Sequence, residues 1–256
     1  MKISVITVTY NAEDLIEQTI ESVASQDYEN VEHLIIDGQS TDNTIAIIKR
    51  LEGKISRWIS EPDDGIYDAM NKAIELSSGD WINFLNAGDT FCHPDTLSKV
   101  AIELEAEADF VYGDRCRISE SGKSTFEAAR PIEETMLREA VFHQSLFNRR
   151  DTLKGGYSRH YELASDFEFV VRAYKNGKRF KKIDLPICNF LEGGTSRQQF
   201  NMARLETMKL ILNSVKYRGR KRSLDFKLRS KIVVPGDVEL KRMKNQKKKS
   251  IAMLLV

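Results

Sequence analysis

Short apolar segments alternate with amphipathic segments along the first 113 residues of the chain. Four apolar segments are typical of buried strands: 3–9, 31–36, 55–60 and 81–85. Four segments carry apolar side chains at helical spacing: 13–25, 40–51, 66–76 and 94–107. A short strand is predicted at 110–112. This alternation with short loops predicts an α/β fold, in which helices cover both faces of a mostly parallel sheet.

The second half of the chain has a weaker pattern. Residues 122–138 are irregular, whereas residues 164–176 have the spacing of a helix that Gly177 ends. We predict a further strand at 180–185 and a further helix at 202–215. No internal repeat is present, so the chain is not a repeat protein.

Polar residues stand where three of the predicted strands end. Thr9–Asn11 follow the first strand, Asp37 follows the second, and Asn86–Asp89 follow the fourth. Ligands of such sheets bind at the carboxyl ends of the strands, so we expect these residues to share one site. Asp37 could accept hydrogen bonds from a base or a ribose hydroxyl. It could equally help to cap the helix that follows it.

The turn after the first strand lacks the glycines of a phosphate-binding loop. It reads Thr-Tyr-Asn-Ala-Glu, with an acid in the first helical turn. This argues against a dinucleotide-binding Rossmann domain and against a P-loop. A bound diphosphate would then need a divalent cation held by carboxylates. Asp89 is placed to be such a ligand, although an Asp in a Gly-Asp turn is often only structural.

Charge is distributed unevenly along the chain. Residues 218–249 contain thirteen Lys or Arg and three Asp or Glu, a net charge of +10, so the rest carries −9. The basic residues are interleaved with apolar ones, which suits an anionic membrane surface. A solvated tail is the alternative. Nucleic acid is not expected as a partner, because no aromatic platform or recognition motif accompanies these basic residues.

The cysteines and the apolar runs bear on the cellular compartment. Cys92, Cys116 and Cys188 are odd in number, widely separated and without metal-binding spacing, which favours a reducing environment. The amino terminus lacks the apolar run of a signal peptide, and no run reaches the roughly 18 residues that span a bilayer. We therefore expect a cytoplasmic protein, peripheral on the inner face of the plasma membrane through residues 218–256.

Four motifs closely resemble those of glycosyltransferase family 2, and within it the bacterial polysaccharide and O-antigen type. They occur in the family's order and spacing across roughly the first 90 residues: Ile3 to Asn11, Ile35 to Asp42, Asp64 to Asn71 and Phe84 to Asp89. A looser similarity continues through His143-Gln144, Asp166 and Gly193–Ser196, and it fades after about residue 215.

The resemblance implies a GT-A fold in residues 1–215. The nucleotide-sugar-binding half would be residues 1–113 and the acceptor-binding half residues 114–215, followed by a basic, amphipathic helical extension at 216–256. It assigns to the nucleoside pocket Thr9, Asn11 and Asp37. A second segment would lie beside the base, ribose or sugar, and includes Asp63, Asp64, Tyr67 and Asn71.

The metal site implied by the resemblance departs from the family pattern. Asp89 would match the last acid of the family's Asp-x-Asp motif, which binds Mn²⁺ or Mg²⁺ at the diphosphate. Asn86 replaces the usual first acid; its amide can hydrogen-bond a ribose but brings no charge. The metal would rest on Asp89, the phosphates and water. His143 could be a further ligand, or a neutral histidine held by a backbone partner.

The resemblance also implies an inverting mechanism, in which a carboxylate takes the proton of the acceptor hydroxyl. The acidic base position falls best on Asp166, at the start of the helix over 164–176. Asp166 could instead be only the helix N-cap, a role that Ser165 could share. Glu168 is the alternative base, but two residues further along a helix it should point elsewhere.

The loop Glu192–Arg197 contains two glycines, a hydroxyl pair and an arginine. It could close on the diphosphate, with Arg197 pairing a phosphate, or it could be a plain surface loop.

Together these features predict an inverting, metal-dependent sugar transferase of the hexosyl or N-acetylhexosaminyl class. The donor would be a nucleotide diphospho-sugar, UDP-linked, and the acceptor a lipid-linked or oligosaccharide hydroxyl in bacterial surface polysaccharide synthesis. Two alternatives remain: a nucleotidyltransferase on a related fold, and a non-catalytic nucleotide-sugar-binding subunit.

Overall fold

The computed structural model describes residues 1–105, 107–135, 141–193, 206–207 and 210, all within one compact unit, Met1–Ile211. Most of the helix predicted at 202–215 lies outside these residues, although Glu206, Thr207 and Leu210 are helical. The extension predicted at 216–256 lies wholly outside them. Within the described ranges, no helix has the length and apolar character needed to cross a membrane.

The strands of the described residues form one nine-stranded sheet. Their bounds are β1 (Ile3–Thr9), β2 (Val31–Asp37), β3 (Arg57–Ser60), β4 (Trp81–Phe84), β5 (Thr90–Phe91), β6 (Phe110–Ile118), β7 (Ser124–Glu127), β8 (Leu146–Arg149) and β9 (Phe180–Leu191). The order is β3-β2-β1-β4-β8-β6-β9-β5, and β7 pairs with β6 outside this path. β1 to β4 are mutually parallel, while β8 enters antiparallel between β4 and β6.

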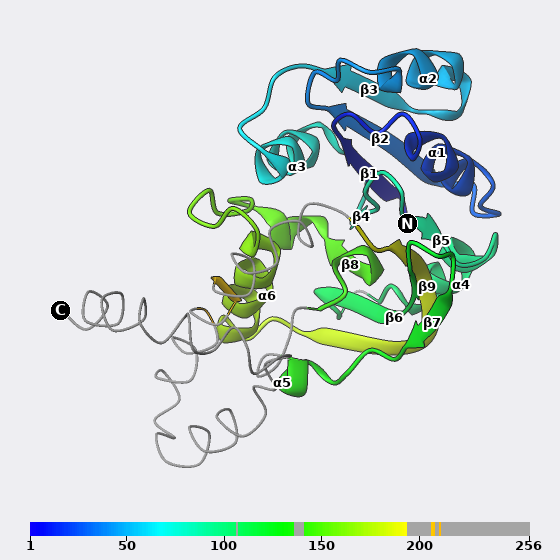
Figure 1. The fold of residues 1–256 in the computed structure, drawn as a ribbon. Helices are drawn as coiled ribbons and strands as arrows, with labels where there is room; N and C mark the ends of the chain where they lie inside the picture. The colour runs from blue at the N-terminus through cyan, green and yellow to red at the C-terminus, as the bar shows by residue number, and fades with distance from the viewer. Residues whose placement is uncertain (106, 136–140, 194–205, 208–209, 211–256) are drawn as a thin grey trace, which may run out of the picture. The chain divides into compact units, whose positions relative to one another are not determined.

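Helices flank this sheet, as the sequence predicts. Their bounds are α1 (Ile16–Ala24), α2 (Thr44–Arg50), α3 (Ile66–Leu76), α4 (Thr96–Glu103), α5 (Ile132–Thr135) and α6 (Ser165–Lys175). Short 3-10 turns occupy Glu52–Lys54, His143–Ser145 and Arg150–Leu153. Figure 1 shows α1 and α2 on one side of β1 to β3 and α3 on the other. The predicted α/β fold with a flanked, mostly parallel sheet is therefore confirmed.

Apolar side chains at helical spacing fix α1 and α2 against the sheet. Ile16 and Ile20 of α1 and Ile48 of α2 pack on Ile35 of β2, and all four are fully buried. Burying one such side chain stabilises the fold by about 1.5–3 kcal/mol. A second cluster fills the space between the later strands and α4, and includes Trp81, Leu97, Val100, Val111 and Ile187.

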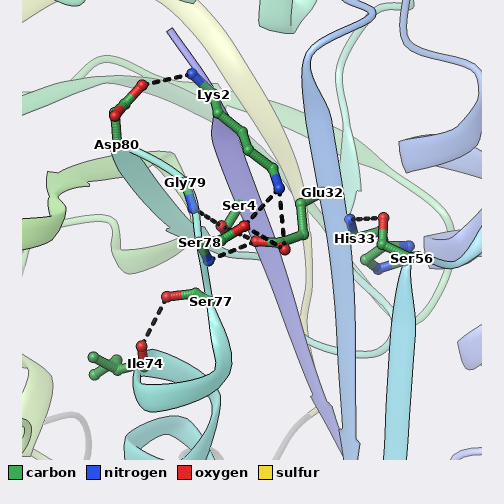
Figure 2. A network of polar contacts seen from close by, with 10 residues as sticks. All are labelled: Lys2, Ser4, Glu32, His33, Ser56, Ile74, Ser77, Ser78, Gly79 and Asp80. Carbon is green, nitrogen blue, oxygen red and sulfur yellow. Dashed lines mark hydrogen bonds and ion pairs between the residues drawn. The ribbon is translucent and has the colours of Figure 1, made fainter.

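The strand order reverses at β1, because β2 and β3 lie on one side of it and β4 on the other. Ligands of open α/β sheets bind outside the carboxyl ends of the strands at such a switch point. The opposite, amino ends of the same strands are closed by a network around Glu32, in which Lys2, Ser4 and Ser78 donate to its carboxylate (Figure 2). The switch point therefore makes the carboxyl ends the expected place for a ligand.

The second half differs most from the sequence prediction. The irregular segment 122–138 contains β7 and α5 among its described residues, and the short strand expected at 110–112 extends to Ile118. β9 continues to Leu191, six residues beyond the predicted end. β5 and β8 were not predicted. Both are short, and β5 has only two residues, so no alternation of apolar and polar positions can mark it.

Candidate active site

The carboxyl ends of β1 and β2 lie side by side, with Thr9 opposite Asp37 in the parallel register. Asp37 is fully buried and accepts three hydrogen bonds: from the backbone N–H and the hydroxyl of Ser40 (2.9 and 2.5 Å) and from the hydroxyl of Ser60 (2.6 Å). The helix α2 begins only at Thr44, so Asp37 does not cap it. Its carboxylate instead organises the loop after β2.

Asn11 joins this loop to the one after β1. Its backbone adopts the left-handed conformation (φ 47°), its N–H donates to Ser40 Oγ (2.7 Å), and its Oδ1 accepts from the N–H of Thr41 (2.9 Å). The neighbouring Thr9 hydroxyl is buried and has no hydrogen-bond partner among the described residues. The structure therefore brings together Thr9, Asn11 and Asp37, as predicted, and leaves Thr9 with an unused polar group.

Tyr10 belongs to the range Thr9–Asn11 that the sequence places at this edge, although the sequence assigns it no role. Its side chain is 63% exposed, and its ring borders Gly38. A Cβ at position 38 would lie 2.6 Å from Asp63 Oδ2 and 3.4 Å from Tyr10 Cδ2, so a larger residue there would displace the Asp63 side chain. The signal in the sequence is an aromatic residue directly after a buried strand.

Asp166 reaches the same side of the molecule from α6. The hydroxyl of Tyr67, on α3, donates to Asp166 Oδ1 over 2.9 Å, although the two residues are 99 positions apart. Burial and the nearby Asp166 carboxylate raise the pKa of Tyr67 well above its usual range, so Tyr67 remains a proton donor to that carboxylate. The N-cap of α6 is Ala164, and no side chain caps the helix. Asp166 is therefore not the helix N-cap.

Asn71, one turn further along α3, holds the loop that precedes α6. Its Oδ1 accepts from the N–H of Tyr157 (2.7 Å), and its Nδ2 donates to the Tyr157 carbonyl (3.1 Å). Asp68, on the same helix, pairs with Arg159 (2.5 Å). The exposed Asp64 lies in the turn before α3. Contacts of Asp64 and Asn71 with a donor remain predictions. The amide of Asn71 already makes both of its hydrogen bonds to the backbone of Tyr157.

His143 is a buried, neutral histidine. Its Nε2 is 3.1 Å from the hydroxyl of Tyr157, and its ring stacks on Phe84 with the centroids 5.3 Å apart. Burial lowers the pKa of His143, and the nearby Asp166 opposes this only in part. Of the two readings of His143, the structure favours a neutral histidine held by a partner. The partner is the hydroxyl of Tyr157.

Asp89 lies in the turn after β4 and is only 4% exposed. Its Oδ1 accepts from the N–H of Leu191 (2.9 Å). Burial raises the pKa of Asp89 to about 7, although the side chain of Gln144 and the charge of Arg115 act in the other direction. In the same turn, Asn86 Oδ1 is buried and has no hydrogen-bond partner among the described residues.

This turn fits a divalent cation. It offers one carboxylate whose charge is poorly compensated and one amide oxygen without a partner, and oxygen ligands of both kinds suit Mg²⁺ and Mn²⁺. Among the described residues, no group of three or more His, Cys, Asp or Glu could hold a metal by itself. A cation here would need further ligands, such as phosphate oxygens and water.

Asp166 and His143 are linked through two tyrosines. Tyr67 donates to Asp166, its ring lies 5.6 Å from that of Tyr157 (centroid to centroid), and the hydroxyl of Tyr157 is 3.1 Å from His143 Nε2. Glu168, the alternative base, instead pairs with Arg172 on its own helix (3.2 Å).

The loop predicted to close on a phosphate is only partly described. Glu192 pairs with Arg117 (2.7 Å) and its N–H donates to the Ile118 carbonyl (2.9 Å), which anchors the start of the loop on β6. Gly193 follows with φ 119°, a conformation that favours glycine. Arg197 lies outside the described residues, so its pairing with a phosphate remains a prediction.

Known structures share this fold. The structure of S. aureus TarS 1–349 in complex with UDP-GlcNAc has a TM-score of 0.66 at 21% identity, and the match covers 84% of this chain but only 66% of that fragment. Glucosyl-3-phosphoglycerate synthase from Mycobacterium tuberculosis, solved with Mn²⁺, UDP and glucosyl-3-phosphoglycerate, has a TM-score of 0.58 at 16% identity, covering 83% of this chain and 79% of that one. These similarities support the GT-A fold that the sequence predicts.

Sequence relatives identify the family. The model of "Glycosyl transferase family 2" matches residues 4–183. A PGL/p-HBAD biosynthesis glycosyltransferase of Mycobacterium bovis is 31% identical over 68% of this chain and 70% of its own length. The amylovoran biosynthesis glycosyltransferase AmsB of Erwinia amylovora is 27% identical over 73% and 68%. The chain therefore belongs to glycosyl transferase family 2 and is a glycosyltransferase.

Proposed function

We propose that this enzyme transfers a sugar from a UDP-linked nucleotide diphospho-sugar to a hydroxyl group, with inversion at the anomeric carbon and with the help of a divalent cation. The acceptor would be a lipid-linked or oligosaccharide intermediate of bacterial surface polysaccharide synthesis, of which the O-antigen is one kind. Relatives named for PGL/p-HBAD biosynthesis and for amylovoran biosynthesis support this class of acceptor. Structures of the fold with UDP, UDP-GlcNAc and Mn²⁺ support the donor and the cation.

The donor's nucleoside would lie over the ends of β1 and β2. The exposed ring of Tyr10 offers a face on which a base can stack. Beside it, the side chain of Asp63 lies against Gly38, and the Thr9 hydroxyl has hydrogen-bonding capacity that the described residues do not use. Asp37 would act mainly by holding the shape of this edge, because its oxygens already accept three hydrogen bonds.

Asp89 and Asn86 would hold the cation together with the donor's phosphates. When bound, the cation would neutralise the diphosphate and stabilise it as a leaving group. The protein's own contribution is the buried carboxylate of Asp89. Burial raises its pKa to about 7, and a bound cation would favour its ionised form.

Asp166 would take the proton from the attacking hydroxyl. The hydroxyl of Tyr67 donates to Oδ1, which fixes the orientation of the carboxylate. The other carboxylate oxygen, Oδ2, is then directed by this bond and could accept the acceptor's proton. An ionised carboxylate is the form that this role requires, and the neutral His143 nearby adds no competing charge.

One observation carries the proposal: the hydroxyl of Tyr67, in the motif from Asp64 to Asn71, donates to Asp166 on α6 over 2.9 Å. A sugar transferase needs one charged group for the leaving diphosphate and another for the incoming hydroxyl, on opposite sides of the reacting carbon. Asp166 would serve the hydroxyl, and Asp89, in the turn after β4, would serve the diphosphate.

The first experiment measures UDP release from UDP-glucose, UDP-galactose and UDP-GlcNAc, with Mn²⁺ and with EDTA. We expect turnover of at least one donor only with the metal. Asp89→Ala should abolish it, and Asp166→Asn should lower it by at least 100-fold while the donor still binds. Full activity in both variants would refute the assignment of the site.

A non-catalytic binding subunit would bind a donor in a thermal-shift screen without releasing UDP, and a nucleotidyltransferase would release pyrophosphate from UTP instead. Either result would favour one of these alternatives.

Whether residues 218–256 bind membrane is a separate prediction. Deleting them should abolish binding to anionic vesicles, and unchanged binding would contradict it.

A further inference from the structure

A carboxylate from far along the chain holds the amino end of α6. Glu206 accepts hydrogen bonds from three consecutive backbone N–H groups: Oε1 from Glu162 (3.1 Å), and Oε2 from Leu163 and Ala164 (3.0 Å each). These three residues come immediately before α6. The contact therefore joins residue 206 to the segment that leads into the helix bearing Asp166.

The segment has no equivalent support of its own. Ala164 occupies the N-cap position, where its side chain cannot accept a hydrogen bond. The hydroxyl of Ser165 donates to the carbonyl of Ser158 (2.8 Å) and is not used as a cap. A carboxylate at this end of a helix also interacts favourably with the helix dipole. Glu206 thus satisfies the N–H groups of the three residues that lead into the helix, rather than those of its first turn.

Asp166 is placed by the same segment. It is the second residue of α6, two positions after Ala164, and its Oδ1 must meet the hydroxyl of Tyr67. From the α3 side, Tyr67 and Asn71 fix Asp166 and Tyr157. Glu206 holds the backbone of residues 162–164, which lies between Tyr157 and Asp166. A shift of that backbone would move Asp166 with it.

We propose that Glu206 is a positioning residue for Asp166, acting through the backbone of residues 162–164. This inference rests on the proposed function, in which Asp166 is the catalytic base. Glu206 lies beyond residues 4–183, the part of the chain that the family model matches. In this proposal, the position of Asp166 depends on the segment around residue 206, which lies outside the part of the chain that the family model matches.

The test compares Glu206→Gln with Glu162→Gln as a matched control. Gln keeps the size of Glu but has one acceptor oxygen, so it cannot accept all three N–H groups. Glu162 is in the same segment, but its exposed side chain makes no hydrogen bond among the described residues. Hydrogen exchange of a peptide covering 159–168 reports on the backbone without needing turnover. Circular dichroism and a urea midpoint establish that each variant folds, and Glu206→Ala gives the fuller deletion.

We expect the amides of residues 162–164 to exchange at least tenfold faster in Glu206→Gln and faster again in Glu206→Ala. UDP release from the best donor of the panel, with Mn²⁺, should show kcat about tenfold lower in Glu206→Gln and KM for the donor within twofold of wild type. Glu162→Gln should match wild type in both measurements. Such a split between kcat and KM is not expected from a general loss of structure.

Combining Glu206→Gln with Asp166→Asn shows whether one acts through the other. If Glu206 positions Asp166, the double variant should be no slower than Asp166→Asn alone. Unchanged exchange, an unchanged kcat in Glu206→Gln, or losses that multiply in the double variant would each overturn the proposal, and would leave the assigned base intact if Asp166→Asn is inactive. Full activity of Asp166→Asn would instead refute the base, and the positioning proposal with it.

Discussion

The pH dependence of stability should reveal the network at the amino ends of β1 and β2. Glu32 accepts hydrogen bonds from Ser4 Oγ (2.5 Å), from the backbone N–H and hydroxyl of Ser78 (2.8 and 2.7 Å) and from Lys2 Nζ (3.3 Å) (Figure 2). These bonds tie the starts of two strands to the turn before β4. We predict that Glu32→Gln destabilises the protein at pH 7 but much less in acid.

The magnitude follows from the pKa of Glu32. Burial alone would raise this pKa, but the hydrogen bonds from Ser4, Ser78 and Lys2 lower it from 4.5 to about 2. One pKa unit corresponds to about 1.4 kcal/mol, so the ionised carboxylate stabilises the fold by up to about 3 kcal/mol. The Glu32 side chain is 13% exposed and Lys2 is more exposed, so solvent partly screens their interaction. We therefore expect Glu32→Gln to lower the free energy of unfolding by about 2–3 kcal/mol at pH 7.

The direction of the pH effect is set by the lowered pKa. Above pH 4.5 Glu32 is ionised in both the folded and the unfolded chain, and its full stabilisation is present. As the pH falls from 4.5 towards 2, the unfolded chain takes up the proton first, and the stabilisation is lost. The stability difference between wild type and Glu32→Gln should therefore narrow by about 1–2 kcal/mol between pH 7 and pH 3.

Urea unfolding at pH 7, 5, 4 and 3 measures this difference directly. Glu75→Gln is the control, because Glu75 is exposed and has no hydrogen-bond partner among the described residues. It should change the free energy of unfolding by under about 0.5 kcal/mol. A Glu32→Gln effect that stays the same at every pH would show that charge is not what stabilises the network. An effect under about 0.5 kcal/mol at pH 7 would refute the reasoning altogether.

Three further predictions concern other parts of the molecule. Burial lowers the pKa of His33 from 6.5 to about 3, so wild type should lose about 2 kcal/mol more than His33→Gln when urea unfolding is compared at pH 7 and pH 5. Tyr67→Phe removes the hydroxyl that donates to Asp166 and should lower kcat for UDP release about tenfold, with donor affinity unchanged in calorimetry. Gly156→Ala should cost about 2–3 kcal/mol in urea unfolding, because residue 156 has φ 63° and the added Cβ would clash with Asn71 Oδ1, whereas Gly53→Ala, where a Cβ meets nothing within 4 Å, should be tolerated.

The parallel half of the fold could be predicted because its signals are local. β1 and α3 begin and end where the apolar pattern does, at Ile3–Thr9 and Ile66–Leu76. The later strands are different. β8 pairs with β4 and β6, and β5 pairs with the far end of β9, so their stability comes from partners distant in sequence. Two to four residues carry too little periodicity for such pairings to appear in the pattern itself.

From the sequence, members of a site can be proposed, but their contacts cannot. The rule that ligands bind at strand ends gathered Thr9, Asp37 and Asp89 without any knowledge of side-chain geometry. It could not reveal that Asp37 is occupied by Ser40 and Ser60, because those bonds depend on where two loops fold. Nor could it link Tyr67 to Asp166, which are 99 residues apart.

The motif from Asp64 to Asn71 shows how this limit changes the interpretation of the site. The resemblance assigns the segment to the donor, yet three of its residues contact the second half of the chain: Tyr67 binds Asp166, Asp68 binds Arg159, and Asn71 binds Tyr157. Positions 67, 68 and 71 lie on neighbouring parts of one helical surface, since residues three and four apart are adjacent on a helix. In the proposed mechanism, α3 would border the donor and also hold the base. Loss of activity in a variant of this helix would therefore not by itself demonstrate donor contact; donor affinity must be measured apart from turnover.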